Sequence, residues 1–181
     1  MRIKQWLAGK ILSLFGWKVT GDQVTTPRGI FVVAPHTHWL DFPLGILTRQ
    51  YLGLNVNFMA KKSLFDSPVG FIFRSLGGHP VDRSRRQGMV RSAVEAFDKG
   101  EISYLAVAPE GTRKKVDRLK TGFYYIALEG KIPLYLSAFD YEHREVNFTG
   151  PVWVDSSNPR QMEEIEDHFR GIRGKVPEYS F

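Results

Sequence analysis

Two histidines and an aspartate lie close together in the segment VVAPHTHWLDFP, residues 32–43. His36 and Asp41 are separated by about 500° of rotation on a continuous helix, so they meet only if the chain turns between them. Pro35, followed by a predicted helix from residue 40, permits that turn. A carboxylate bound to one imidazole nitrogen fixes the tautomer and leaves the other nitrogen free to accept a proton. The segment therefore offers a general base with an orienting acid.

The chain offers this base no obvious nucleophile of its own. It contains no cysteine, which excludes a thiolate nucleophile, disulfides and cysteine-bound zinc. Ser63 and Thr37 are available, but neither stands in a G-x-S-x-G nucleophile pattern. We therefore expect the substrate to supply the nucleophile, as a hydroxyl group or a water molecule.

His38 opens a competing interpretation, because H-x-H with a nearby acid can bind a metal ion. The metallo-hydrolase pattern H-x-H-x-D-H requires aspartate at position 40 and histidine at position 41. This chain has Leu40 and Asp41 there, and its other histidines lack ligand spacing. We therefore expect no metal site, and keep a metal-dependent hydrolase using His36, His38 and Asp41 as an alternative.

The segment APEGTRKK, residues 108–115, has the composition of an anion-binding loop. The backbone N–H groups of Gly111 and Thr112, the Thr112 hydroxyl and the Arg113 guanidinium can hold a phosphate. Glu110 can orient an arginine or accept a substrate hydroxyl. A second basic segment, GGHPVDRSRR at residues 77–86, places Arg83 after two glycines. Each segment is equally well interpreted, by itself, as a solvated charged surface.

Composition indicates one folded domain with an anionic partner. The chain has 181 residues, 43% of them hydrophobic, and a net charge of +6. We find no recognition-helix, zinc-finger or RNP-type pattern, so we expect no nucleic-acid partner.

Apolar runs alternate with helical patterns along the chain. Buried strands are predicted at residues 30–34, 56–60, 103–109 and 132–139, with antiparallel strand material at 145–154 near the sheet edge. Helices are predicted at 40–52, 67–76 with Ser67 as cap, 85–98, 121–130 and 158–174 with Asn158 as cap, and a turn or short hairpin at 21–29. This alternation predicts an α/β domain with a mainly parallel sheet. The polar segments follow its strands, where such sheets form their sites.

The N-terminal segment is predicted to be an amphipathic helix over residues 2–18. Its apolar stripe consists of Ile3, Leu7, Ile11, Leu14 and Phe15, and its charged residues are all basic. Lys10 interrupts the apolar run, and no cleavage pattern follows, so we expect neither a signal peptide nor a membrane span. We expect residues 1–20 to lie on an anionic membrane surface, ahead of a catalytic domain at 21–181. The alternative is a helix packed on the core.

These motifs together resemble the glycerolipid acyltransferases, the family that contains bacterial 1-acylglycerol-3-phosphate acyltransferase. His36 to Asp41 has the family's H-x-x-x-x-D form, and GGHPVDR resembles its second motif. PEGTR is similar to the third motif, and Pro133 to the proline that opens a strand in the fourth. Order and approximate spacing also match, over about residues 30–140.

The resemblance implies acyl transfer from acyl-CoA or acyl-carrier protein to a lysolipid hydroxyl, in phospholipid biosynthesis at the cytoplasmic side of a membrane. In that scheme His36 is the general base and Asp41 orients it, with no metal or cofactor. The resemblance assigns the acceptor phosphate to Arg83 and to the loop of Glu110, Gly111, Thr112 and Arg113. Lys61 matches a lysine often found between the first two motifs, and we expect it to bind substrate.

Pro35 and His38 depart from the family pattern, which commonly has asparagine and a small residue at these positions. These two departures bear on the identity of the lipid acceptor, which we expect to be lysophosphatidic acid. Alternatives are another lysophospholipid or an amino-acid lysolipid without phosphate. A non-catalytic lipid-binding module is a further alternative.

Overall fold

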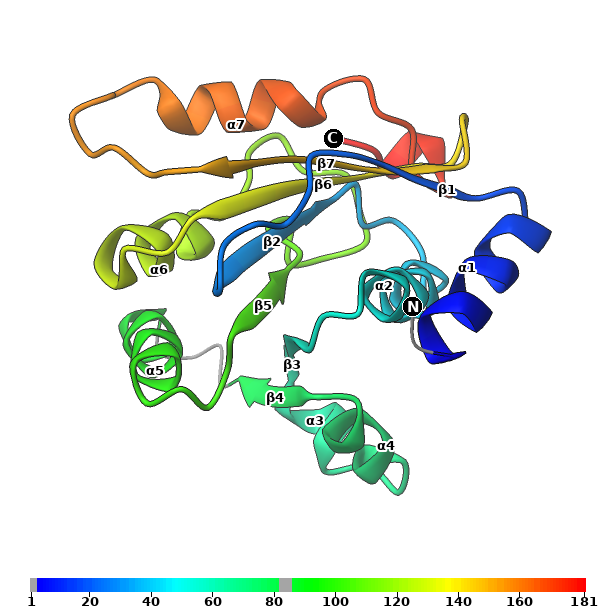
Figure 1. Ribbon diagram of the computed structural model, residues 1–181. Coiled ribbons are helices and arrows are strands. Elements are labelled where there is room, and N and C mark those ends of the chain that lie inside the picture. Colours follow the sequence, from blue (N-terminus) through cyan, green and yellow to red (C-terminus); the bar gives the residue numbers. More distant parts are fainter. Residues whose placement is uncertain (1–2, 82–85) are drawn as a thin grey trace.

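The computed structural model describes residues 3–81 and 86–181 of the chain (Figure 1). Its central feature is a seven-stranded sheet in the order β1-β7-β6-β2-β5-β3-β4. All neighbouring strands in this sheet are parallel except β6 and β7, which are antiparallel. The predicted single α/β domain with a mainly parallel sheet is confirmed.

The strands are β1 (Lys18–Gly21), β2 (Gly29–Ala34), β3 (Val56–Lys61), β4 (Gly78–Val81), β5 (Tyr104–Val107), β6 (Leu134–Asp140) and β7 (Glu145–Val152). The helices are α1 (Ile3–Leu14), α2 (Asp41–Leu52), α3 (Lys62–Phe65), α4 (Gly70–Ser75), α5 (Arg86–Asp98), α6 (Gly122–Gly130) and α7 (Gln161–Phe169), followed by a short 3-10 helix, Pro177–Tyr179. The strands predicted at 30–34, 56–60, 103–109 and 132–139 correspond to β2, β3, β5 and β6.

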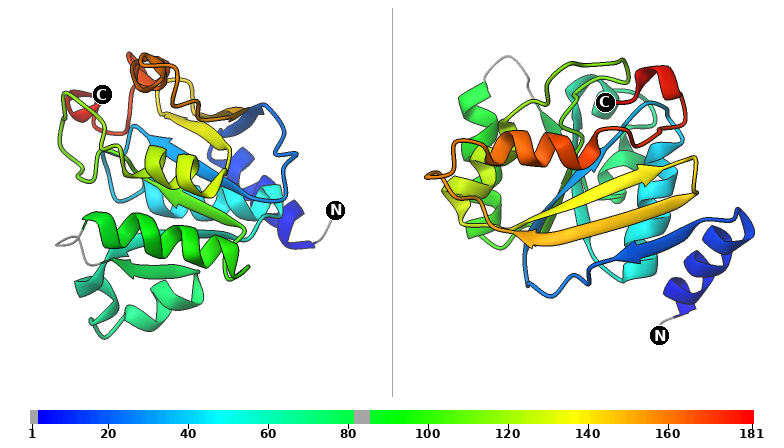
Figure 2. Two further views of the ribbon diagram at one scale, coloured as in Figure 1. Left: turned by 90° about the vertical axis from the view of Figure 1, so that its left-hand side faces the viewer. Right: turned by 90° about the horizontal axis from the view of Figure 1, so that it is seen from above.

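Helices cover both faces of the sheet, because side chains along a strand alternate between them. Ile30 and Val32 of β2 pack with side chains of α5, α6 and α7 in one core cluster. Phe31, between them in sequence, belongs to a second cluster with side chains of α1 and α2. Figure 2 shows α7 crossing the sheet over β6 and β7, with α5 and α6 stacked side by side. The molecule therefore has three layers.

The first segment of the chain differs from its prediction. The helix ends at Leu14 rather than residue 18, because Gly16 adopts a left-handed conformation with φ of 74°. Gly16 N–H donates to the Ser13 carbonyl at 2.9 Å, and Trp17 N–H to the Leu12 carbonyl at 2.9 Å. This pattern is a Schellman motif, which terminates a helix. The chain then forms β1, which the sequence did not predict, and β1 takes the edge position beside β7.

Two predicted helix caps are also wrong. Ser67 does not cap α4, which begins at Gly70; its hydroxyl donates to the Leu64 carbonyl at 2.6 Å. Asn158 does not cap α7, which begins at Gln161; its side-chain oxygen accepts the Arg160 N–H at 3.0 Å. Both side chains form local turns ahead of their helices, a competing use of the same residue types.

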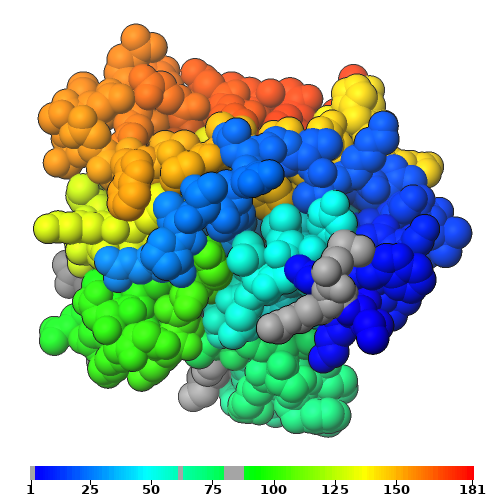
Figure 3. All heavy atoms as spheres, in the orientation of Figure 1, coloured from blue at the N-terminus to red at the C-terminus, as the bar shows by residue number. Residues whose placement is uncertain are grey.

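Helix α1 packs on α2 through a narrow face of small or inward-pointing side chains. Ala8 and Leu12 are buried, whereas Ile3 is 83% and Leu14 81% exposed. The predicted apolar stripe thus faces outward. The dark blue atoms of the N-terminal segment lie along one margin of the molecule (Figure 3). In the described part of the chain, no helix is long and apolar enough to cross a bilayer.

Candidate active site

The site lies at the carboxyl ends of the central parallel strands. The loop after β2 carries His36, the loop after β5 carries Glu110, and Tyr141 follows β6 directly. Because β2 lies between β5 and β6, these three residues leave the same edge of the sheet. This is the edge at which open parallel sheets bind their ligands.

His36 and Asp41 lie in direct contact. Nδ1 of His36 is 3.1 Å from Oδ2 of Asp41, and the Asp41 side chain is almost completely buried. Asp41 is the first residue of α2, so its charge lies at the positive end of the helix dipole. The loop between the two residues curls over the carboxylate, and the N–H groups of Thr37 and His38 each donate to Oδ2 at 2.9 Å.

Tyr141 completes the binding of the Asp41 carboxylate. Its hydroxyl donates to Oδ1 of Asp41 at 2.7 Å, across a separation of 100 residues. Burial and the neighbouring carboxylate raise the pKa of Tyr141, so the hydroxyl stays protonated as a donor. Burial alone would raise the pKa of Asp41, but the hydrogen bonds from His36, His38 and Tyr141 outweigh it and hold that pKa below its usual value. Asp41 is therefore a fixed anion.

This geometry leaves one nitrogen of His36 available. With Nδ1 directed at Asp41, its proton lies on that side, and Nε2 accepts no hydrogen bond from any described residue. The His36 side chain is 23% exposed, so a substrate hydroxyl can approach it. The arrangement is a base oriented by a carboxylate, which can remove a proton from an incoming hydroxyl.

Glu110 lies beneath His36, where the sequence predicted a contact with substrate. Its Oε2 accepts the backbone N–H of His36 at 2.8 Å, and its side chain is 2% exposed. Burial raises the pKa of Glu110 to about 7, although the hydrogen bond from His36 acts in the opposite direction. Its other oxygen, Oε1, is buried without a hydrogen-bond partner in the described structure. In this geometry Glu110 positions the loop that carries the base.

The rest of the 110–113 loop is a tight turn at the surface. Gly111 has φ of 64°, and its N–H donates to the Ala108 carbonyl at 3.1 Å, so that donor is already used within the turn. Thr112 and Arg113 are exposed. A Cβ on Gly111 would meet the Lys120 side chain, which lies across the turn. Lys120 thus adds a cation beside the predicted phosphate loop.

The remaining predicted site residues are placed less completely. Lys61 ends β3, which is adjacent to β5, so its backbone lies at the same edge of the sheet as the 110–113 loop. Arg83, predicted to bind the acceptor phosphate, lies outside the described residues.

His38 does not join His36 on the carboxylate through its ring. Its Nδ1 accepts the backbone N–H of Leu40 at 3.3 Å, and only its own backbone N–H reaches Asp41. Among the residues that the structure describes, no group of three or more His, Cys, Asp or Glu side chains could hold a metal ion.

Sequence reasoning missed Tyr141 and Lys120. No motif contains either residue, and the only signal for Tyr141 was its place directly after a buried strand, at the edge that carries His36. Lys120 follows a long loop, so its sequence position does not indicate that it returns to Gly111. Its backbone N–H donates to the Pro109 carbonyl at 2.9 Å and closes that loop.

A base oriented by a carboxylate can activate a hydroxyl group, and the comparisons with known proteins define the class of this protein. A family model described as Acyltransferase matches residues 16–138, well over half of the chain. The chain belongs to the acyltransferase family. The family and enzyme class predicted from the motifs are thereby confirmed.

A solved structure shows the same fold. It is the 1-acyl-sn-glycerophosphate (LPA) acyltransferase PlsC from Thermotoga maritima, with a TM-score of 0.65 and 21% sequence identity. The match covers 91% of this chain and 74% of that one. No curated protein matches the chain.

Proposed function

We propose that the protein transfers a fatty acyl group from acyl-CoA or acyl-carrier protein to the free hydroxyl of 1-acylglycerol-3-phosphate, in phospholipid biosynthesis. The observation that carries this proposal is the His36–Asp41 contact with Nε2 of His36 left available. Membership of the acyltransferase family and the fold shared with the Thermotoga enzyme support it. So does the absence of a G-x-S-x-G nucleophile pattern from the chain.

In the proposed reaction, Nε2 of His36 accepts the proton of the acceptor hydroxyl as its oxygen attacks the thioester carbonyl. Asp41 stabilises the imidazolium that forms. The tetrahedral intermediate then collapses with cleavage of the carbon–sulfur bond, and His36 returns the proton to the departing thiolate. A general base of this kind is worth roughly 10²–10⁴ in rate. This route uses no metal ion and no bound cofactor.

The acceptor phosphate is assigned to basic groups around the 110–113 loop. Thr112 and Arg113 are exposed at this loop, and Lys120 lies across Gly111. Arg83 completes the proposed phosphate site, and Lys61 is proposed to bind substrate. Glu110 acts indirectly, by holding the backbone of His36.

The reaction is proposed to occur at the cytoplasmic surface of a membrane. The outward-facing apolar stripe of α1 supports this location, since a lysolipid acceptor resides in a bilayer. The anionic lipid surface would attract a chain with net charge +6.

Incubation with labelled acyl thioesters and a lysolipid panel, with products measured by mass spectrometry, tests the proposal. We expect acylated product from lysophosphatidic acid, and its loss by a factor of roughly 10²–10⁴ in His36→Ala and Asp41→Asn. His38→Ala is the matched control and should retain most activity, because its ring accepts the Leu40 N–H and only its backbone N–H, which the variant keeps, donates to Asp41.

Full activity in either dyad variant would overturn the assigned roles. Product only from an amino-acid lysolipid would replace the acceptor. Thioester hydrolysis that needs no acceptor and ceases in His38→Ala would instead favour the hydrolase.

A further inference from the structure

A groove of about 710 Å³ lies between α1, α2 and residues 173–177. His36 and the 110–113 loop do not line it, but Tyr141, which donates to Asp41, does. The groove therefore adjoins the candidate active site without including its base. Its volume is within the range of roughly 300–1,000 Å³ that is typical of small-molecule sites.

The inner wall of the groove is apolar. It is formed by side chains from two helices and the loop ahead of the second: Leu12, Phe15, Leu40, Pro43, Leu44 and Leu47. Phe15, which follows α1, is 62% exposed, so this wall continues outward to the exposed stripe of α1. An acyl chain can therefore pass from a bilayer in contact with α1 into the groove without crossing a polar surface.

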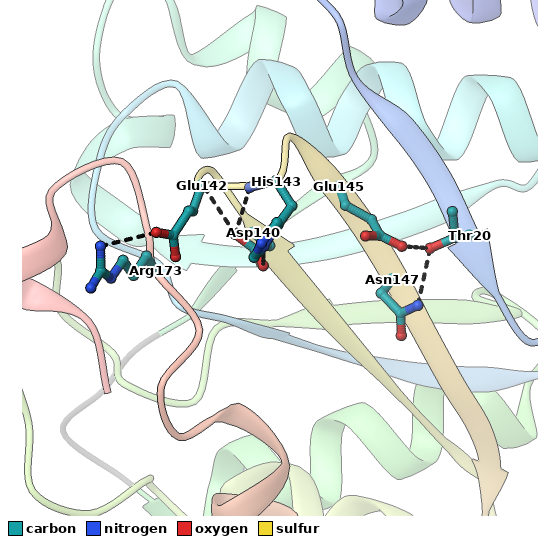
Figure 4. Close-up of polar contacts among 7 residues, drawn as sticks. All are labelled: Thr20, Asp140, Glu142, His143, Glu145, Asn147 and Arg173. Atoms are coloured by element: carbon teal, nitrogen blue, oxygen red, sulfur yellow. Dashed lines mark hydrogen bonds and ion pairs between the residues drawn. The ribbon is translucent and has the colours of Figure 1, made fainter.

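The rim of the groove is basic. Arg144, Arg173 and Lys175 all line it, together with one acid, Glu142. Figure 4 shows the Arg173 guanidinium directed at the Glu142 carboxylate, with Nη1 3.0 Å from Oε1. The nearby Asp140 has its Oδ2 2.7 Å from Nδ1 of His143, and in the described structure it forms no ion pair with Arg144 or Lys175.

Two of these cations have no acidic partner in the described residues. Nη1 of Arg144 donates to the Phe15 carbonyl at 3.3 Å, which anchors the side chain but leaves its charge uncompensated. Nζ of Lys175 lies 5.9 Å from the centre of the Tyr141 ring. Two uncompensated cations beside an apolar wall match a phosphate group attached to a hydrocarbon chain.

We propose that this groove holds an anionic phospholipid drawn from the bilayer, distinct from the lipid that reacts. Its phosphate lies between Arg144 and Lys175, and one acyl chain lies along α2. The proposal shares with the proposed function only the docking of α1 on a membrane, and it requires no turnover.

The groove is tested with phosphatidylcholine vesicles doped with a photoreactive phospholipid that carries a diazirine on its acyl chain. One arm uses a phosphatidylglycerol probe and the other a phosphatidylcholine probe, both without acyl thioester. After irradiation, mass spectrometry locates the labelled residues. We expect the anionic probe to label residues 40–47 and 173–177, and the zwitterionic probe to label them at least about tenfold less.

A second set of variants removes the charge of the groove's rim and the free volume of the groove separately. The double variant Arg144→Gln/Lys175→Gln should lose about ten- to thirtyfold of the labelling, because each basic residue near a membrane surface contributes on the order of a few-fold in affinity. The double variant Lys99→Gln/Arg160→Gln removes the same charge from exposed positions outside the groove and should keep the labelling. Leu47→Trp fills the groove without changing charge and should also abolish the labelling.

Equal labelling by both probes would overturn the proposal. So would equal losses in the two charge-removing variants, since diffuse attraction alone would produce them. Labelling confined to α1 would also overturn the proposal. In His36→Ala, acyl transfer should disappear while the labelling persists, so failure of the proposed function is distinguishable from failure of the groove.

Discussion

Asp41 receives four donors, three from the loop at residues 36–38 and one from Tyr141 after β6. His36 contributes its ring, Thr37 and His38 contribute backbone N–H groups, and Tyr141 contributes a hydroxyl from the far side. The carboxylate is thus fixed before a substrate arrives, which is what an orienting acid requires.

Tyr141→Phe tests this fixation. The variant keeps the ring but loses one hydrogen bond to an ionised group, which is worth about 1.5 kcal/mol, so we expect kcat to fall roughly tenfold with the KM for the acceptor unchanged. The pKa of Asp41 should rise toward its ordinary value. A depressed folded-state pKa stabilises a protein above the unfolded pKa, and this contribution disappears as pH falls through the folded pKa.

The stability deficit of Tyr141→Phe should therefore be full at pH 7 and should fade below about pH 4, as measured by urea unfolding. Tyr125→Phe, at an exposed position on α6, is the control and should change neither kcat nor stability. A deficit in Tyr141→Phe that is independent of pH, with normal kcat, would show that the hydroxyl only supports packing.

The contribution of Glu110 to folding stability depends on pH in the opposite direction to that of Asp41. Its pKa of about 7 lies above the 4.5 of an ordinary glutamate, because burial disfavours its charge. The unfolded chain thus releases this proton at lower pH than the folded one, and stability falls as pH rises from 4.5 to 7. Glu110→Gln can still accept the His36 N–H and carries no charge.

We therefore expect Glu110→Gln to be more stable than the wild type at pH 8, by up to about 3 kcal/mol, and to be equal to it near pH 4. Chemical denaturation at the two pH values measures the difference. Glu129→Gln, on α6, is the control and should show no such dependence. A variant less stable than the wild type at pH 8 would mean that the Glu110 charge is needed by a cation near the loop.

At the scale of elements, α1 combines a narrow packed face with a broad uncovered one. Gln5, Ala8 and Leu12 are directed toward the protein, and the apolar stripe predicted from the sequence is directed away from it. Periodicity located this stripe correctly, but it could not reveal which face meets the protein, because the packed face has only two buried apolar residues, Ala8 and Leu12, and the stripe has more.

The stripe makes a prediction about membrane binding. Burying one leucine side chain is worth about 2 kcal/mol, so Leu7→Glu or Leu14→Glu should lower binding to vesicles at least about thirtyfold. Ser13→Glu adds the same charge to an exposed position on another side of α1 and should have only a small effect. Sedimentation with phosphatidylcholine–phosphatidylglycerol vesicles measures the three variants. Equal losses in all of them would leave charge, rather than the stripe, as the cause.

Two of the errors in element boundaries share one cause. Ser67 and Asn158 were predicted as helix caps, yet each forms a local turn before its helix. Polar side chains that cap helices also form turns, and tertiary contacts decide between the two uses. By contrast, the apolar strands 30–34 and 132–139 were predictable, because burial on both faces leaves a continuous apolar run.

At the scale of the whole molecule, the three-layer class was predictable but the order of the strands was not. The alternation of strands and helices predicts helices on both faces of a parallel sheet. It does not reveal that β6 pairs with β2, which is what brings Tyr141 to Asp41. His36 and Asp41 could be predicted together because they belong to one local motif. Their contacts with Glu110, after β5, and Tyr141, after β6, could not, because the tertiary fold brings these two residues to the site.

The predicted division of the chain into 1–20 and 21–181 stays a proposal about function. Strand β1 crosses that boundary and pairs with β7, so residues 1–20 are joined to residues 21–181 through the sheet. We expect the two segments to move as one body on a bilayer.

The pairing of β1 with β7 also has a consequence for biosynthesis. Lys18 pairs with Glu145, so β1 cannot be secured until the ribosome has delivered the chain beyond residue 148. Until then α1 is tethered to the nascent chain with its apolar stripe uncovered, beside a strand that has no partner. An early encounter of α1 with the membrane or a chaperone would shield both while the sheet is completed.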